Sequence, residues 1–230
     1  MQVWLALGVV LVAALLNNMV APDAYLLTCV AAAAVLMMLA HLDGLTRTDV
    51  GLGPGSLRAG TVWGVALAGI VLAGYLLVLA VPAMRTALVD DRATQLSTAG
   101  VFWQAMVRVP LGTVLLEEVA FRGVLWAMIA RRRGVWWATG ASSALFGLWH
   151  VAPALRLADV NAAAAAVFGS GPFGQTLAVS AAAVGTAVAG AVFCELRRRS
   201  GSLLTPAALH WALNGGGYLF SWTTAQLWTA

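Results

Sequence analysis

Residues 60–83 read GTVWGVALAGIVLAGYLLVLAVPA and contain no Asp, Glu, Lys, Arg or His. A helix that crosses the hydrocarbon core of a bilayer needs about 20 mostly apolar residues, and this run is long enough to do so. The whole chain has the same character, since 61% of its 230 residues are hydrophobic, 10% are charged and the mean hydropathy is +0.88. Soluble domains are about 45–50% apolar and about 25% charged. We therefore expect an all-α, polytopic membrane protein.

Six further apolar runs resemble this one in length and composition. The first of them has neither a basic flank nor a small-residue cleavage site, so we expect a retained span and not a signal peptide. We expect the seven spans to form one integral membrane domain over residues 1–230. The stretch 101–109 ends at the helix breakers Pro110 and Gly112, and we expect either an interfacial helix that leads into the span 111–130 or an additional short span, the eighth. The six runs are 2–18, 24–42, 111–130, 135–152, 173–195 and 203–221.

The positive charge of the chain is distributed as in a membrane protein. There is no lysine, and six of the thirteen arginines form two triplets, at 131–133 and 197–199, each directly after an apolar run. Short cytoplasmic loops carry such an excess of Arg and Lys. This pattern argues against a nucleic-acid partner and predicts a multi-pass protein of the cell membrane with both triplets, the 43–59 loop and the N-terminus in the cytoplasm. Three arginines are then expected outside: Arg85, Arg92 and Arg156.

Three ionisable residues lie within the predicted fourth span, in the run LLEEVAFRG of residues 115–123. Ionisable groups at bilayer depth are costly and usually functional. Glu118 and Arg122 are four residues apart, which favours a helical ion pair. Glu117 points about 100° away from Glu118 around the helix, so the same arginine does not easily neutralise it. We interpret the pair as scaffolding and Glu117 as the chemical group, with a purely structural triad as the alternative.

The fifth and seventh spans also carry polar residues. Phe146-x-x-x-His150 ends the fifth span, where the phenyl ring is placed to shield the imidazole from lipid, and His210-x-x-x-Asn214 puts two hydrogen-bond donors on one helical face. The structural alternatives are a core or interface histidine for His150 and helix–helix hydrogen bonds for His210 and Asn214. Measured from the arginine triplets at ~1.5 Å per residue, Glu117, His150 and Asn214 lie about 21, 25 and 22 Å into the membrane. We therefore expect one intramembrane site.

The ordered motifs EExxxR, FxxxH and HxxxN resemble those of the CAAX-protease and bacteriocin-processing (CPBP or Abi) intramembrane peptidases. The resemblance covers about residues 110–215. It implies an endopeptidase that cleaves near the membrane in a lipidated or hydrophobic protein or peptide, as the prenyl-protein endopeptidases of the family do when they remove the last three residues of their substrates. It also implies that Glu117 activates water with the help of His150, that His210 and Asn214 stabilise the oxyanion, and that Glu118, Arg122 and Phe146 support the site.

Two questions stay open at this point. No cofactor is firmly implied, because a glutamate-activated water needs no metal and the sequence has no HExxH motif, but zinc held by Glu117, His150 and His210 is the alternative. The rival function is a non-catalytic immunity factor, scaffold or transporter that keeps the polar pocket. The natural substrate, the side from which it enters and the oligomeric state do not follow from the sequence.

Overall fold

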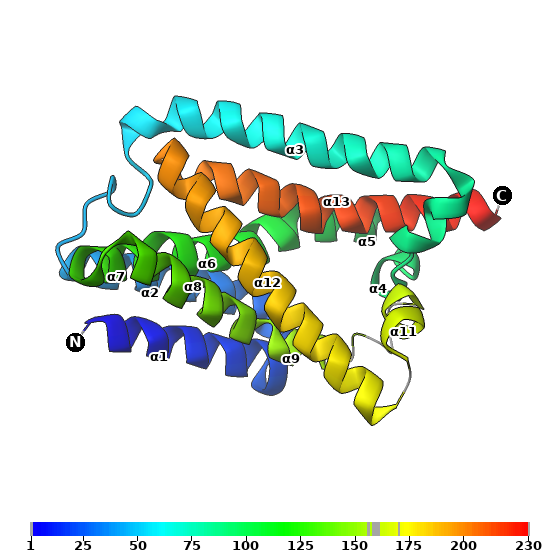
Figure 1. Ribbon diagram of the computed structural model, residues 1–230, viewed down its shortest axis with the longest axis horizontal. Coiled ribbons are helices and arrows are strands. Elements are labelled where there is room, and N and C mark those ends of the chain that lie inside the picture. Colours follow the sequence, from blue (N-terminus) through cyan, green and yellow to red (C-terminus); the bar gives the residue numbers. More distant parts are fainter. Residues whose placement is uncertain (1, 156, 158–161, 170, 230) are drawn as a thin grey trace.

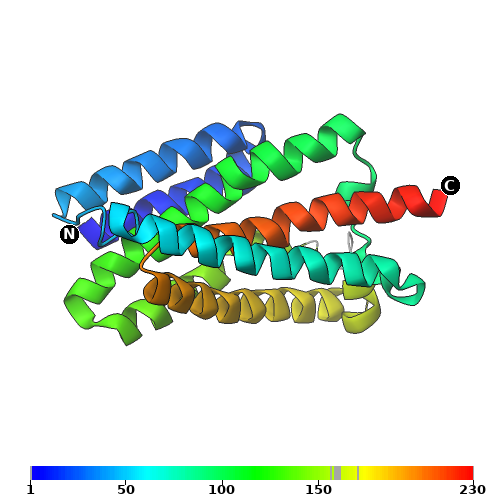
Figure 2. The same cartoon turned by 90° about the horizontal axis from the view of Figure 1, so that it is seen from above.

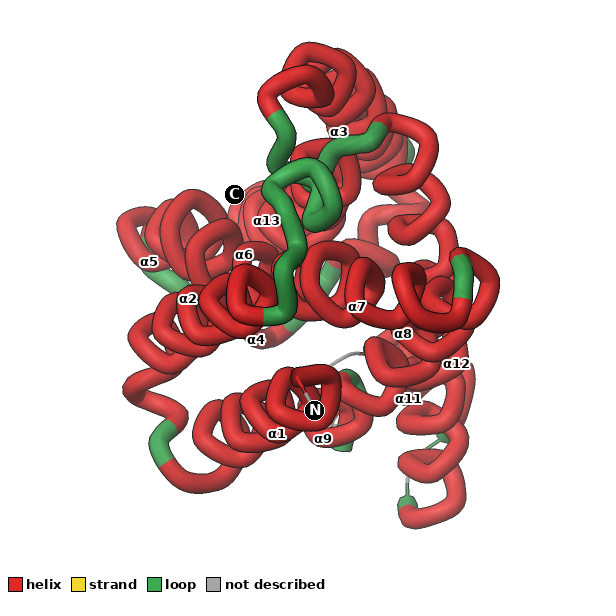
Figure 3. The backbone as a smooth tube through the Cα atoms, turned by 90° about the vertical axis from the view of Figure 1, so that its left-hand side faces the viewer, coloured by secondary structure: helices red, strands yellow, loops and turns green. Residues whose placement is uncertain are grey.

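The computed structural model describes residues 2–155, 157, 162–169 and 171–229, and these form helices and loops without a strand (Figure 3). The predicted all-α fold is thus confirmed for this part of the chain. In chain order the helical segments are α1 (Gln2–Leu15), η1 (Leu16–Val20), η2 (Pro22–Ala24), α2 (Tyr25–Leu42), η3 (Pro54–Ser56), α3 (Leu57–Ala80), η4 (Pro82–Leu88), α4 (Asp91–Thr94), α5 (Thr98–Trp103), η5 (Gln104–Val114), α6 (Leu115–Glu117), η6 (Glu118–Val124), α7 (Leu125–Arg133), α8 (Val135–Trp149), α9 (Val151–Ala154), α11 (Ala162–Phe168), α12 (Pro172–Ser200) and α13 (Leu204–Thr229).

The helices pair along their lengths. Helix α3 packs along α13, α1 packs along α2, and α12 crosses the bundle obliquely to pack on α8 (Figure 1). The long helical segment from α5 to α7 touches the α1–α2 pair on one side and α13 on the other (Figure 2). It is therefore the central element of the bundle.

Four helices of the described residues are long and apolar enough to cross a membrane: Gln2–Val20, Pro22–Leu42, Pro54–Ala80 and Pro172–Ser200. They agree with four of the seven predicted spans. The predicted span 135–152 falls mainly on α8, whose 15 residues are fewer than the about 20 that a straight crossing needs. The other two, 111–130 and 203–221, contain the polar residues considered below. These three spans, and an eighth, stay predictions.

The helix boundary predicted at Pro110 and Gly112 is wrong. The chain is helical without a break from Thr98 to Arg133, but Gln104–Val114 and Glu118–Val124 are π-helical. Proline has no N–H and clashes with the carbonyl one α-helical turn earlier. A π-helix bonds i to i+5 in a wider turn, which changes where that carbonyl lies. The segment 101–109 thus belongs to the same helix as 111–130.

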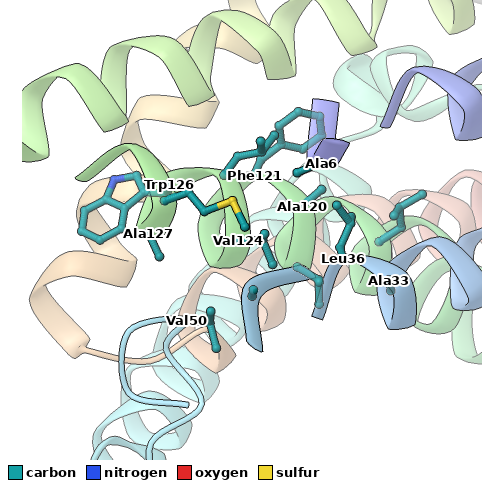
Figure 4. Packing of buried hydrophobic residues seen from close by; sticks show 14 of the residues in the cluster. Ala6, Ala33, Leu36, Val50, Ala120, Phe121, Val124, Trp126 and Ala127 are labelled. Carbon is teal, nitrogen blue, oxygen red and sulfur yellow. The ribbon is translucent and has the colours of Figure 1, made fainter. Parts of the chain in front are cut away.

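Small residues let the central helix pack closely against α1 and α2. Ala6 of α1 and Ala33 of α2 are fully or almost fully buried, and Leu36 of α2 lies in the same cluster as Phe121 and Val124 of η6 (Figure 4). Every residue of η6 is buried. This packing holds the segment with the EExxxR motif inside the protein.

The two ends of the bundle differ in charge. Arg131 and Arg132 both bind the carboxylate of Asp43, and Arg197 donates to the carbonyl of Asp49. Both arginine triplets, the 43–56 loop and the N-terminus therefore lie at one end, with η4 and α4 at the other (Figure 1). Arg156 lies outside the described residues. The arrangement agrees with the predicted grouping of charges, and which end faces the cytoplasm stays a prediction.

Candidate active site

Glu117 is only 3% exposed, and its two carboxylate oxygens differ in surroundings. Oε1 accepts a hydrogen bond of 3.0 Å from the indole Nε1 of Trp149. Oε2 accepts no hydrogen bond from any described residue. The bond from Trp149 to Oε1 therefore fixes the position of the carboxylate, and Oε2 is available to accept a proton or a hydrogen bond.

Two imidazoles face the free oxygen of Glu117. Nε2 of His210 lies 3.6 Å from Oε2 and Nε2 of His150 lies 3.9 Å from it, both longer than a direct hydrogen bond. His150 Nδ1 is 2.8 Å from the carbonyl oxygen of Phe146. Because a carbonyl only accepts, Nδ1 carries a proton and Nε2 of the neutral ring is a hydrogen-bond acceptor. Side chains from α6, α13 and the end of α8 thus converge on one point.

The predicted ion pair between Glu118 and Arg122 is present. Arg122 Nη1 donates to Glu118 Oε1 at 3.2 Å, and the two side chains are 1% exposed or less. The same oxygen lies 2.7 Å from Nδ1 of His210. Glu118 therefore fixes the orientation of His210, whose other nitrogen faces Glu117. Second partners of this kind commonly orient a functional histidine.

Aromatic rings enclose the buried guanidinium of Arg122. Its Cζ lies 3.8 Å from the ring centroid of Phe146 and 4.8 Å from that of Phe193. Cation–π contacts of this kind offset part of the cost of taking a charge out of water. Phe146 also packs edge-on against His150, with ring centroids 4.5 Å apart. The ring predicted to shield His150 thus shields Arg122 as well.

Comparison with known proteins agrees with this geometry. Residues 99–216, just over half of the chain, match the family described as type II CAAX prenyl endopeptidase Rce1-like. The chain belongs to this family. The matched segment includes all three motifs and contains the resemblance predicted for residues 110–215. No curated protein and no solved structure matches the chain.

Asn214 is the one predicted site residue of this Rce1-like chain that the structure does not connect to the others. It lies one turn after His210 on α13 and is half-buried, and its carboxamide makes no hydrogen bond within the described part of the chain. A pair of donors from His210 and Asn214 remains a prediction.

Sequence reasoning missed two site residues, Trp149 and Phe193. An indole N–H within an apolar segment needs an acceptor, and the neighbour of His150 could have been suspected on that ground. Phe193 gave no such signal. It reaches Arg122 and His210 because α12 also packs on η6 and α13, and no local sequence pattern indicates that packing.

The zinc alternative stays a prediction. Among the described residues, no group of three or more His, Cys, Asp and Glu side chains is placed to hold a metal ion. In the Rce1-like site, Glu118 binds Nδ1 of His210, as carboxylates also do for histidines that hold a metal through Nε2. The mechanism proposed below uses only the side chains of the chain itself.

Proposed function

We propose that this Rce1-like protein is an intramembrane endopeptidase that hydrolyses a peptide bond in a hydrophobic or lipidated protein or peptide. The observation that carries the proposal is the free oxygen of Glu117, which faces two imidazole nitrogens while the other oxygen is held by Trp149. A carboxylate held in this way, with a base-competent oxygen in a water-poor site, suits general-base chemistry.

In the proposed reaction, Glu117 Oε2 removes a proton from the attacking water. The water oxygen forms a bond to the scissile carbonyl carbon, whose oxygen becomes an oxyanion. The unprotonated Nε2 of His150 accepts a hydrogen bond from the second O–H of the water and so orients the attack. Glu117 then returns its proton to the peptide nitrogen as the C–N bond breaks, which gives a carboxylic acid and an amine. The acid passes its remaining proton to the amine, so that a carboxylate and an ammonium group leave the site.

His210 and Asn214 are proposed to donate hydrogen bonds to the oxyanion. For His210 this role has a proton requirement. One proton is shared in the hydrogen bond between Nδ1 and Glu118, so Nε2 donates only when the Glu118–His210 pair carries a second proton. Arg122 offsets the charge of Glu118 and keeps this pair in place.

The test is hydrolysis of a prenylated C-terminal peptide by the purified protein in liposomes, analysed by mass spectrometry. Glu117→Gln keeps the shape and removes the base, so cleavage should fall by about 10²–10⁴. His150→Ala should also abolish it, and His210→Ala or Asn214→Ala should each lower kcat by about 10²–10³. Glu195→Gln is the matched control, since this carboxylate is exposed among the arginines at the end of α12.

Two outcomes would contradict the proposal. Normal cleavage by Glu117→Gln would remove the glutamate from its role as base. Tight binding of the peptide by the wild-type protein without any hydrolysis would instead favour the immunity or scaffold function.

A further inference from the structure

The helix that carries Glu117 presents a row of polar side chains ahead of it. Gln104, Arg108 and Thr113 precede Glu117 at intervals of four, five and four residues. On a regular α-helix, with 3.6 residues per turn, this spacing winds around the axis. The stretch Gln104–Val114 is π-helical, with about 4.4 residues per turn, so these side chains stay on one face. The irregular backbone thus aligns them with the site.

Contacts with Tyr25, the first residue of α2, confirm the alignment. The Arg108 guanidinium lies over its ring, with Cζ 4.4 Å from the centroid. The Tyr25 hydroxyl is 2.8 Å from Oγ1 of Thr113. Arg108 Nη1 also donates to Gln104 Oε1 at 3.4 Å. One tyrosine therefore touches two members of the row and holds the guanidinium in place.

Arg108 carries a charge that no neighbouring carboxylate in the described part of the chain neutralises. It is half-buried, and no carboxylate of the described residues lies within ion-pairing distance of it. Arg122, farther along the same helix, has Glu118 as its counter-ion. A guanidinium held by a ring and an amide, with no anion of its own, is suited to bind a carboxylate through two parallel hydrogen bonds.

We propose that Arg108 binds the free C-terminal carboxylate of the substrate while the scissile bond lies at Glu117. This inference rests on the proposed peptidase function and adds a specificity determinant to it. Arg108 precedes Glu117 by nine residues, at most about 14 Å along the axis at ~1.5 Å per residue. An extended peptide covers about 3.3–3.6 Å per residue. The carboxylate should therefore lie about three to four residues beyond the cleaved bond.

The experiment compares matched peptides that end in a free carboxylate or in a carboxamide, in nanodiscs of zwitterionic lipid. Wild-type kcat/KM should favour the carboxylate by about 10- to 100-fold, the range that hydrogen bonds to charged groups provide. Arg108→Gln should remove this preference through KM, and Arg108→Lys should restore part of it. Arg85→Gln, another arginine at the same end of the bundle, should keep the wild-type preference.

A binding measurement separates this inference from the peptidase function. In a Glu117→Gln background, which cannot hydrolyse the peptide by the proposed route, fluorescence anisotropy should still show tighter binding of the carboxylate form, and Arg108→Gln should abolish the difference. Equal affinities for both peptides would overturn the inference, even if the enzyme is active. An equal loss on both peptides in Arg108→Gln would make the residue structural. A cleavage site at a fixed distance from the N-terminus of the peptide, regardless of where the carboxylate lies, would also overturn it.

Discussion

At the residue scale, Arg122 connects the chemistry of the site to its stability. It is completely buried, ion-paired with Glu118 and enclosed by Phe146 and Phe193. Arg122→Ala leaves the Glu118 carboxylate buried without its cation, which typically costs about 3–5 kcal/mol. Arg122→Lys keeps the charge but loses the planar contacts with the two rings, so it should fall between alanine and the wild type.

The measurement for Arg122 is thermal unfolding in detergent, together with the fraction of monodisperse protein in size-exclusion chromatography. Arg133→Ala, at the exposed end of α7, is the control and should behave as the wild type. A stable, monodisperse and inactive Arg122→Ala protein would contradict the structural role and would place the guanidinium in contact with substrate.

At the level of single residues, the sequence predicts contacts between side chains on the same helix and misses contacts between side chains on different helices. The Glu118–Arg122 pair followed from a spacing of four on a single helix. The bond from Trp149 to Glu117 joins α8 to α6, and the 2.7 Å contact of His210 with Glu118 joins α13 to η6. Only the packing of the bundle creates these contacts. The orientation of Glu117 and of His210 depends on these contacts.

At the element scale, the approach of α8 to α12 sets the position of His150. Gly147 lies three residues before His150, and a Cβ added there would come within 2.5 Å of the carbonyl oxygen of Ala183 on α12. A backbone atom cannot move aside cheaply, so Gly147→Ala should cost about 1–3 kcal/mol by overpacking and should displace His150. Thermal unfolding and peptide hydrolysis measure the two effects.

The same helix offers a matched control. A Cβ added at Gly140 meets nothing within 4 Å. Gly140→Ala should therefore stabilise the helix by about 0.5–1 kcal/mol and leave hydrolysis unchanged. If both substitutions had the same effect, close packing of α8 on α12 would not position the histidine.

The positions of helices were predictable where an uninterrupted run of hydrophobic residues alone determines them. The runs 2–18, 24–42 and 173–195 correspond to α1, α2 and α12 because nothing in them competes with apolar helix formation. The error at Pro110 has a different origin. Whether a proline ends a helix or is passed by a wider turn depends on the helices packed around it, here α2 and α13. The π-helical segments depend on the same packing, so no local sequence pattern indicates them.

At the scale of the whole molecule, the clustering of basic side chains at one end predicts how the bundle is oriented in the membrane. Asp43 binds Arg131 and Arg132, which places the end of α2 beside the end of α7. The pKa of the Asp43 carboxyl is held below its usual value, chiefly by its hydrogen bond with Arg132, so the carboxylate stays ionised at neutral pH. This end of the bundle therefore carries many arginines, and the Asp43 carboxylate neutralises part of their charge. Such an excess of arginine in short loops marks the cytoplasmic side.

The last prediction tests this orientation with single cysteines. In a background in which both buried native cysteines are replaced by alanine, Arg133→Cys marks the arginine-rich end and Gln95→Cys marks the opposite end; both positions are exposed. With a membrane-impermeant thiol reagent, Gln95→Cys should be labelled in intact cells and Arg133→Cys only after permeabilisation. Each variant is the control for the other, since both must react once the membrane is opened. Labelling of Arg133→Cys from outside, with Gln95→Cys protected, would invert the bundle and place the arginines against the positive-inside rule.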